Sequence, residues 1–159
     1  MQATTRTTTL AWVGLLVRLV VGGVWIVAGA IKLPDPDAGI DAVRAYQLLP
    51  GAVVPAVGLL LPIVEVVVGV ALVLGLLTRF AAVVSCLLFV AFIAGISSAW
   101  ARGITIDCGC FGGGGYDPDA AAKYPWEIAR DVALLAASAF LVWRGRRTRW
   151  ALDARLFRT

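Results

Sequence analysis

The stretch that decides the fold reads AVVPAVGLLLPIVEVVVGVALVLGLL, from Ala52 to Leu77. Its only ionisable residue is Glu65, and at a helical rise of about 1.5 Å per residue it is long enough to cross a hydrocarbon core of about 30 Å. The rest of the chain has the same character, since 60% of its 159 residues are apolar and 15% are charged. A soluble domain of this length cannot bury so much apolar surface. The sequence therefore predicts a membrane protein.

Three further apolar runs flank this stretch. The four runs cover approximately residues 12–33, 52–77, 80–99 and 126–143. They predict an all-α membrane protein, a four-transmembrane-helix bundle with a short interfacial helix in the first outer loop. Asp37 is expected to cap that short helix, which Pro50 ends. Because no internal repeat or composition shift is visible, residues 1–159 are expected to form a single membrane domain.

The first run also imitates a signal peptide. Arg6, an apolar stretch and the small residues Ala28-Gly29-Ala30 follow the order of such a leader and its cleavage site. We favour a membrane span, because Arg18 interrupts the apolar region and the run continues to Ile31.

Charges predict the orientation of the spans. The loops at 34–51 and 100–127 are acidic, whereas the turn at Thr78 and Arg79 and the tail at 144–159 are basic. The positive-inside rule then places both termini and the tail in the cytoplasm and both acidic loops outside the cytoplasmic membrane. Aromatic residues agree with this arrangement, because indoles prefer the two membrane surfaces. The predicted span ends carry Trp12, Trp100, Trp126 and Trp143.

Reactive side chains gather in one outer loop, which reads Asp107-Cys108-Gly109-Cys110-Phe111-Gly112. In an oxidising compartment Cys108 and Cys110 can form a disulfide across Gly109, and so tight a ring is open to exchange with a partner thiol. A static clasp of the loop is the alternative. We favour exchange, because closing so short a loop removes little chain entropy. Cys86, within the third span, is interpreted as a small buried apolar residue.

Composition excludes several kinds of site. The chain has no histidine and three cysteines, so no haem or metal site is expected. The net charge of +4 resides mainly in the arginine-rich tail, which faces lipid headgroups in this topology, so no nucleic-acid partner is expected.

Ionisable residues inside apolar spans form a second candidate site. Arg18 and Glu65 are the deepest, and they are predicted to face each other, either as a structural ion pair or in a polar cavity for a quinone headgroup or a proton path. Lys32, Arg130 and Asp131 are expected near the outer surface, at the height of the cysteine loop. A cation there could stabilise a thiolate that Asp107 disfavours.

The order of these features resembles the MauE/DoxX family of redox-associated membrane proteins. The similarity covers about residues 12 to 143 and runs through Arg18, Ala28-Gly29-Ala30-Ile31-Lys32-Leu33-Pro34, Leu48-Leu49-Pro50, Leu61-Pro62, Glu65, Gly69, Cys108-Gly109-Cys110-Phe111-Gly112 and Arg130-Asp131. The resemblance implies a four-helix bundle and a role in thiol and disulfide chemistry outside the cytoplasmic membrane, with links to maturation of a disulfide-rich periplasmic enzyme and to thioredoxin-like partners. Asp131 stands where members of the family often have Asn.

Together these features predict a membrane thiol-disulfide redox protein. Cys108 and Cys110 would exchange electrons between an extracytoplasmic thioredoxin-like or disulfide-containing protein and a membrane quinone, with Arg18, Glu65, Lys32 and Arg130 as candidate quinone contacts. The alternative is a non-catalytic subunit or assembly factor that docks a redox enzyme or maturation partner. A transporter ranks third, because no pair of broken helices is visible.

Overall fold

The computed structural model describes residues 2–109 and 115–144, with side chains from residue 11 onward. This part of the chain contains five α-helices and no strand, beyond an isolated bridge between Ile106 and Tyr116. The helices are α1 (Gln2–Lys32), α2 (Pro36–Ala45), α3 (Val54–Leu74), α4 (Thr78–Ala101) and α5 (Ala120–Arg144). The prediction of an all-helical protein is confirmed for these residues.

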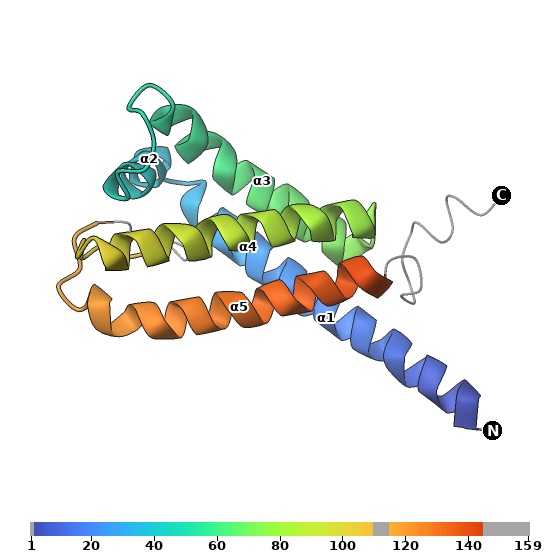
Figure 1. The fold of residues 1–159 in the computed structure, drawn as a ribbon. Coiled ribbons are helices and arrows are strands. Elements are labelled where there is room, and N and C mark those ends of the chain that lie inside the picture. The colour runs from blue at the N-terminus through green and yellow to red at the C-terminus, as the bar shows by residue number, and fades with distance from the viewer. Residues whose placement is uncertain (1, 110–114, 145–159) are drawn as a thin grey trace.

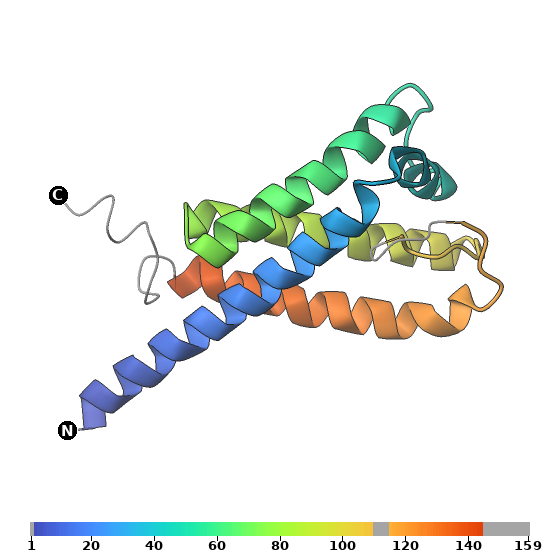
Figure 2. The ribbon, with the colours of Figure 1, turned by 180° about the vertical axis from the view of Figure 1, so that it is seen from behind.

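The long helices pack as two pairs. α1 lies along α3, α4 lies along α5, and α1 also contacts α5, which joins the pairs (Figure 1). The first turns of α1 extend beyond the other helices, as both views show (Figure 2). α2 packs against α3 at the end of the molecule where the cysteine loop lies, and its axis runs across those of the long helices.

Three helices are long and apolar enough to cross a membrane: Ala11–Lys32 of α1, Val54–Leu74 of α3 and Thr78–Ala101 of α4. Large apolar side chains cover their outer faces, as lipid-facing helices require. The chain is therefore a multi-pass membrane protein. α5 does not meet the same criterion, because Lys123, Glu127, Arg130 and Asp131 lie in its first half. The fourth span thus stays a prediction.

The short helix of the first acidic loop differs from its prediction at both ends, and it stops at Ala45, five residues before Pro50. α2 is capped by Asp35, whose side-chain oxygen accepts a hydrogen bond of 3.0 Å from the backbone N–H of Ala38. The prediction that Asp37 is the cap was wrong. Pro36 explains the difference, since its fixed φ angle suits the first helical position and so places the cap at Asp35, two residues upstream of Asp37.

Glycines bring α1 and α3 into close contact. A methyl group on Gly69 would lie 2.7 Å from the backbone oxygen of Gly22, and one on Gly22 would lie 2.8 Å from the oxygen of Gly69. Gly29 faces Pro62 in the same way. The two helices run antiparallel with residue 22 opposite residue 69 and residue 29 opposite residue 62. This register determines which charged residues can meet.

A buried polar chain joins the two helix pairs. The indole N–H of Trp25 on α1 donates to Ser85 of α4 at 2.7 Å, and the Ser85 hydroxyl lies 2.9 Å from that of Ser138 on α5. Ser138 in turn donates to the backbone oxygen of Leu134. The ring of Trp25 also packs on Phe89, with ring centroids 4.5 Å apart. Because the buried hydroxyls of Ser85 and Ser138 both have partners, this contact fixes how the pairs are placed.

Candidate functional site

The cysteine loop is anchored by a buried tyrosine. The hydroxyl of Tyr124, on α5, accepts a hydrogen bond from the backbone N–H of Ile106 at 3.0 Å and lies 2.7 Å from the backbone oxygen of Ile104 and 2.9 Å from that of Ile106. Tyr124 is 2% exposed and packs with Ile96 and Cys108. One side chain thereby satisfies the backbone on the approach to the cysteines.

A second tyrosine holds the loop from the opposite side. Tyr46, at the end of α2, donates from its hydroxyl to the backbone oxygen of Cys108 at 2.8 Å. The guanidinium of Arg102, just after α4, donates to the backbone oxygen of Tyr46. The loop itself turns at Gly109, whose φ is 64° and whose N–H donates to Asp107 at 3.0 Å. The backbone of Cys108 is thus fixed by α2, α4 and α5 together.

The far side of the loop is closed by an exposed ion pair. Lys123 donates to Asp117 at 2.5 Å, and the backbone N–H of Asp119 donates to the same carboxylate at 2.9 Å. The Lys123 ammonium beside it holds the pKa of the Asp117 carboxyl below its usual range, and the carboxylate raises the pKa of Lys123.

The Cys108 side chain is buried among acidic neighbours. It is 9% exposed, and the Glu127 carboxyl hydrogen-bonds it. The ligand atoms of Asp107, Cys108 and Glu127 all lie within 4.8 Å of one another. The second carboxyl oxygen of Glu127 is buried and has no hydrogen-bond partner among the described residues. A carboxylate so placed can accept the thiol proton. The expectation that no metal binds here stays a prediction.

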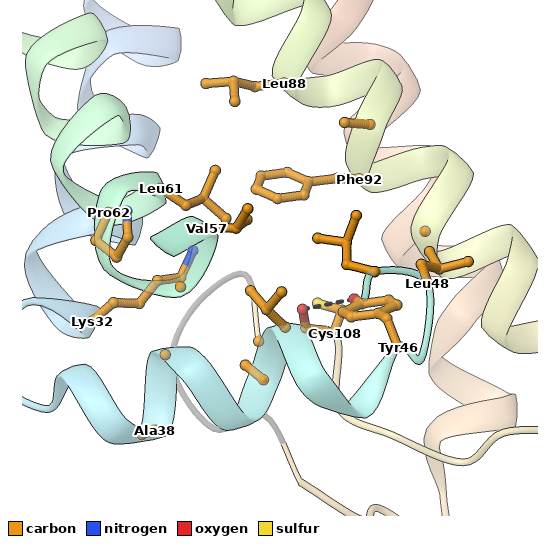
Figure 3. A pocket seen from close by; sticks show the side chains of 18 of the residues that line it. Lys32, Ala38, Tyr46, Leu48, Val57, Leu61, Pro62, Leu88, Phe92 and Cys108 are labelled. Atoms are coloured by element: carbon orange, nitrogen blue, oxygen red, sulfur yellow. Dashed lines mark hydrogen bonds between the residues drawn. The ribbon is translucent and has the colours of Figure 1, made fainter. Parts of the chain in front are cut away.

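An apolar cavity of about 450 Å³ lies beside Cys108. Its walls come from the end of α1, from α2, α3 and α4, and from Cys108 and Gly109 of the loop (Figure 3). Phe92 of α4 and Leu61 of α3 point toward each other across it, and Tyr46 lies next to Cys108 at one wall. Among the described residues that line the cavity, Lys32 alone carries an ammonium group. The cavity therefore joins a thiol, a cation and apolar walls.

Lys32 is the ion-pair partner of Glu65. Its ammonium nitrogen lies 2.7 Å and 2.9 Å from the two carboxylate oxygens, and the Glu65 side chain is fully buried. The predicted pairing of Glu65 with Arg18 was wrong. A methyl group on Gly29 would lie 3.1 Å from the Cβ of Glu65, and the register of α1 and α3 makes residue 65 level with residue 26, about two helical turns from Arg18. Lys32 reaches the carboxylate because its flexible side chain extends back along α1 from the helix end.

Arg18 belongs to the other end of the helix pair. It is 2% exposed, and its guanidinium donates to the backbone oxygen of Val73 at 3.4 Å, close to the end of α3. A guanidinium there can bind the terminal carbonyls of α3, which have no partner within the helix. We therefore interpret Arg18 as a helix-end contact, away from the cavity.

Arg130 and Asp131 lie behind the cavity. The Arg130 guanidinium is 2.9 Å from Asp131, which is 2% exposed, and both border a small pocket with Trp25 and Phe92. Phe92 also lines the large cavity and so lies between the two. Of the four predicted quinone contacts, Lys32 lines the large cavity, Glu65 holds Lys32, and Arg18 and Arg130 do not line it.

The structure describes one of the other two cysteines, Cys86, but not Cys110. Cys110 lies outside the described residues, so its pairing with Cys108 stays a prediction. Cys86 is half-buried on α4, away from the cavity lining. Sequence reasoning missed Tyr46, Tyr124 and Glu127 as site residues. The acidic loop and the tyrosine at the start of α5 were visible, but no periodicity indicates that their side chains converge on a cysteine.

The fold and the site define a class: a multi-pass helical membrane protein with a cysteine-bearing loop fixed over an apolar cavity. Comparison with known proteins assigns the family. The family model described as "Methylamine utilisation protein MauE" matches residues 10–144, and the chain belongs to the MauE family. The resemblance to MauE is thereby confirmed, whereas the link to DoxX stays a prediction.

Two curated relatives share this family. The chain is 36% identical over 98 residues to the methylamine utilization protein MauE of Paracoccus denitrificans, which covers 61% of this chain and 53% of the relative. It is 37% identical over 99 residues to the MauE of Methylophilus methylotrophus, covering 62% and 52%. The chain spans about half the length of the curated relatives it matches. No solved structure matches it.

Proposed function

We propose that this protein is a membrane thiol-disulfide redox protein, in which Cys108 and Cys110 carry electrons from an extracytoplasmic thiol protein to a membrane quinone. The observation that carries the proposal is the position of Cys108. Tyr46 donates to its backbone oxygen, Tyr124 holds the backbone two residues before it, and its side chain lies at the wall of an apolar cavity. A loop that served only as a surface contact would not need a buried thiol fixed in this way.

The burial of Cys108 suggests different roles for the two cysteines. Cys108 is inaccessible to a large partner, so we assign it to the cavity side. Cys110, two residues further along the chain, is assigned to the attack of the partner protein. This division of roles requires that the cysteine loop lies outside the cytoplasmic membrane. We therefore propose the predicted topology, with four spans in the cytoplasmic membrane and both termini inside.

The proposed exchange has two balanced halves. A reduced partner thiolate attacks the Cys108–Cys110 disulfide, and a second partner thiolate displaces the resulting mixed disulfide, so the partner becomes oxidised and the two cysteines become thiols. The quinone then takes two electrons and two protons from these thiols, and the disulfide forms again. Glu127 accepts the proton of Cys108, since its carboxyl hydrogen-bonds that thiol.

The partner is proposed from the names of the relatives. Both relatives are named for methylamine utilization, and we propose that this chain serves the same system. Docking without redox chemistry is the second candidate. Its support is a pair of strongly exposed aromatic residues near the cysteine loop, Tyr116 at 80% and Trp126 at 74%. Such residues are enriched where proteins bind each other.

Trapping of a mixed disulfide tests the proposal. In Cys108→Ser, the Cys110 thiolate can still attack the disulfide of an oxidised partner protein, which releases one partner thiolate, but Cys108 is absent and cannot complete this reverse exchange. This variant should therefore accumulate a covalent complex with an extracytoplasmic thiol protein on a non-reducing gel. Cys110→Ser should trap far less, and Cys86→Ser serves as the matched control without trapping. If neither loop variant traps a partner and the Cys108→Ser, Cys110→Ser double variant still supports the host pathway, docking without redox chemistry replaces the proposal.

A further inference from the structure

We propose that the apolar cavity beside Cys108 is the binding site of the quinone ring, with Lys32 donating a hydrogen bond to one quinone oxygen. This inference rests on the proposed function, because it supplies the place where the electrons of Cys108 and Cys110 leave the protein. It goes further in naming the cavity, the contacts and the route of entry.

The size and lining of the cavity fit a ring with an apolar tail. A volume of about 450 Å³ lies within the range of small-molecule sites, about 300–1,000 Å³. Apolar side chains from three helices make the walls, among them Val43 of α2, Val57 and Leu61 of α3, and Leu88 and Phe92 of α4. The flat side chain of Phe92 offers a face on which a quinone ring can stack.

Lys32 supplies the polar contact. An ammonium group has three N–H donors, and two of those on Lys32 are directed at the oxygens of Glu65. The Lys32 nitrogen also lies 5.6 Å from the centroid of the Phe92 ring, so a ligand that stacks on Phe92 comes within reach of the third donor. Glu65 neutralises the cation, so the site favours an uncharged acceptor of hydrogen bonds over an anion. A neutral quinone carbonyl has this chemistry, whereas a phosphate or carboxylate does not.

The cavity is reached from the lipid side. Several of its lining residues are also exposed on the outer face of the helices, including Ile31 of α1, Leu48 and Leu49 after α2, and Ala91 of α4. In a multi-pass membrane protein such apolar surface faces hydrocarbon. The ligand therefore enters from the bilayer, where isoprenoid quinones are dissolved.

The redox step balances within this site. Two S–H bonds break and one S–S bond forms between Cys108 and Cys110. The two electrons and two protons pass to the quinone, whose carbonyl oxygens become the hydroxyls of a hydroquinone. Cys108 and Lys32 lie on different walls of the cavity (Figure 3). A quinone ring between them is therefore held by Lys32 and reduced from the side of Cys108.

Photolabelling of the full-length protein in lipid nanodiscs tests this inference. The probe is a short-tailed ubiquinone analogue carrying an azido group, with decylubiquinone as the competitor. We expect labelled peptides from α2 and from residues 88–95 of α4, and loss of the label when the competitor is in excess. Label that the competitor does not displace, or that maps to other surfaces, overturns the inference, because it indicates filling by lipid or non-specific contact.

A pair of variants on α4 sharpens the test. Ala91→Phe places a large ring in the cavity wall and should weaken binding of decylubiquinone at least tenfold, whereas Ala94→Phe, also exposed but absent from the lining, should leave it unchanged. Equal affinities for the two variants contradict the proposal. Ala91→Phe should not affect trapping of the partner by Cys108→Ser. Trapping without quinone binding would therefore refute the cavity site alone, and binding without trapping would refute the proposed function alone.

Discussion

Replacing Lys32 by Met should strongly destabilise the protein through Glu65. The Glu65 carboxylate is fully buried, and both of its hydrogen bonds, at 2.7 Å and 2.9 Å, come from this one ammonium. Removing one partner of a buried ion pair costs about 3–5 kcal/mol, because the other charge stays in a low-dielectric environment. Lys32→Met should therefore lower the free energy of unfolding by about 3–5 kcal/mol.

The opposite replacement should cost less. Glu65→Leu leaves the Lys32 side chain, which is 10% exposed at the end of α1 and can turn toward the membrane surface. The double variant, Lys32→Met with Glu65→Leu, replaces the pair by apolar groups of similar size and should be close to the unaltered protein in stability. The double-mutant cycle should then give a coupling of at least about 3–5 kcal/mol, because the double variant regains the stability that Lys32→Met loses.

Equilibrium unfolding by dodecyl sulfate in mixed micelles, followed by circular dichroism, measures each corner of the cycle. Arg44→Met with Asp41→Leu is the control, since this pair is exposed and should show no measurable coupling. Arg18→Met combined with Glu65→Leu should give additive losses, because the two residues lie about two turns apart along the helix pair. Additive losses for Lys32 and Glu65, or strong coupling of Arg18 to Glu65, would refute the assigned pairing.

Three further predictions concern packing and the loop. Gly69→Ala should destabilise the contact of α1 with α3 by about 1–3 kcal/mol in the same unfolding assay, because its methyl group would lie 2.7 Å from the oxygen of Gly22. Gly23→Ala is the control, because its methyl group meets nothing within 4 Å and should not destabilise the contact. Equal losses for the two variants would contradict the close contact. Tyr124→Phe should cost about 1–3 kcal/mol per backbone group left unpaired and speed proteolysis of the loop, so an unchanged cleavage rate would count against the anchor. Because Lys123 and Asp119 lower the pKa of Asp117, this carboxylate stabilises the folded loop above the usual Asp pKa of about 3.9, and the contribution disappears as pH falls through the lowered value. Loop protection against an acid-stable protease should thus be constant from pH 7 to 5 and fall below pH 4, and Asp117→Asn should remove that dependence; a loss between pH 7 and 5 would contradict it.

The apolar runs could be predicted from sequence because burial in lipid demands length and hydrophobicity alone. The observed helices α3 and α4 lie within a few residues of the predicted runs at 52–77 and 80–99. Their exact ends depend on local geometry that the apolar pattern does not carry, such as the left-handed conformation of Gly75 that ends α3. α1 begins at Gln2, upstream of its predicted start, since a helix can continue through residues that are not apolar.

The charged partners could not be predicted in the same way. The depth of Arg18 and Glu65 within their apolar runs predicted that the two side chains meet. The register of α1 against α3, however, is decided by glycine contacts that only packing reveals. The cysteine loop was singled out from its residue types, and its role as the reactive site stays a prediction. Its supports, Tyr46 and Tyr124, come from segments about 60 residues before and 16 residues after Cys108, and no local pattern joins them.

Anaerobic single-turnover reduction of a quinone measures whether Cys108 and Cys110 pass electrons to the membrane. The fully reduced protein, purified without a partner, is mixed with decylubiquinone, and quinone absorbance is followed while the cysteines are counted by thiol labelling. We expect one hydroquinone formed per protein, with loss of the two loop thiols and retention of the Cys86 thiol. We also expect no reduction by Cys108→Ser and normal reduction by Cys86→Ser. Quinone that stays oxidised while all three thiols persist would contradict the claim that Cys108 and Cys110 pass electrons to the membrane.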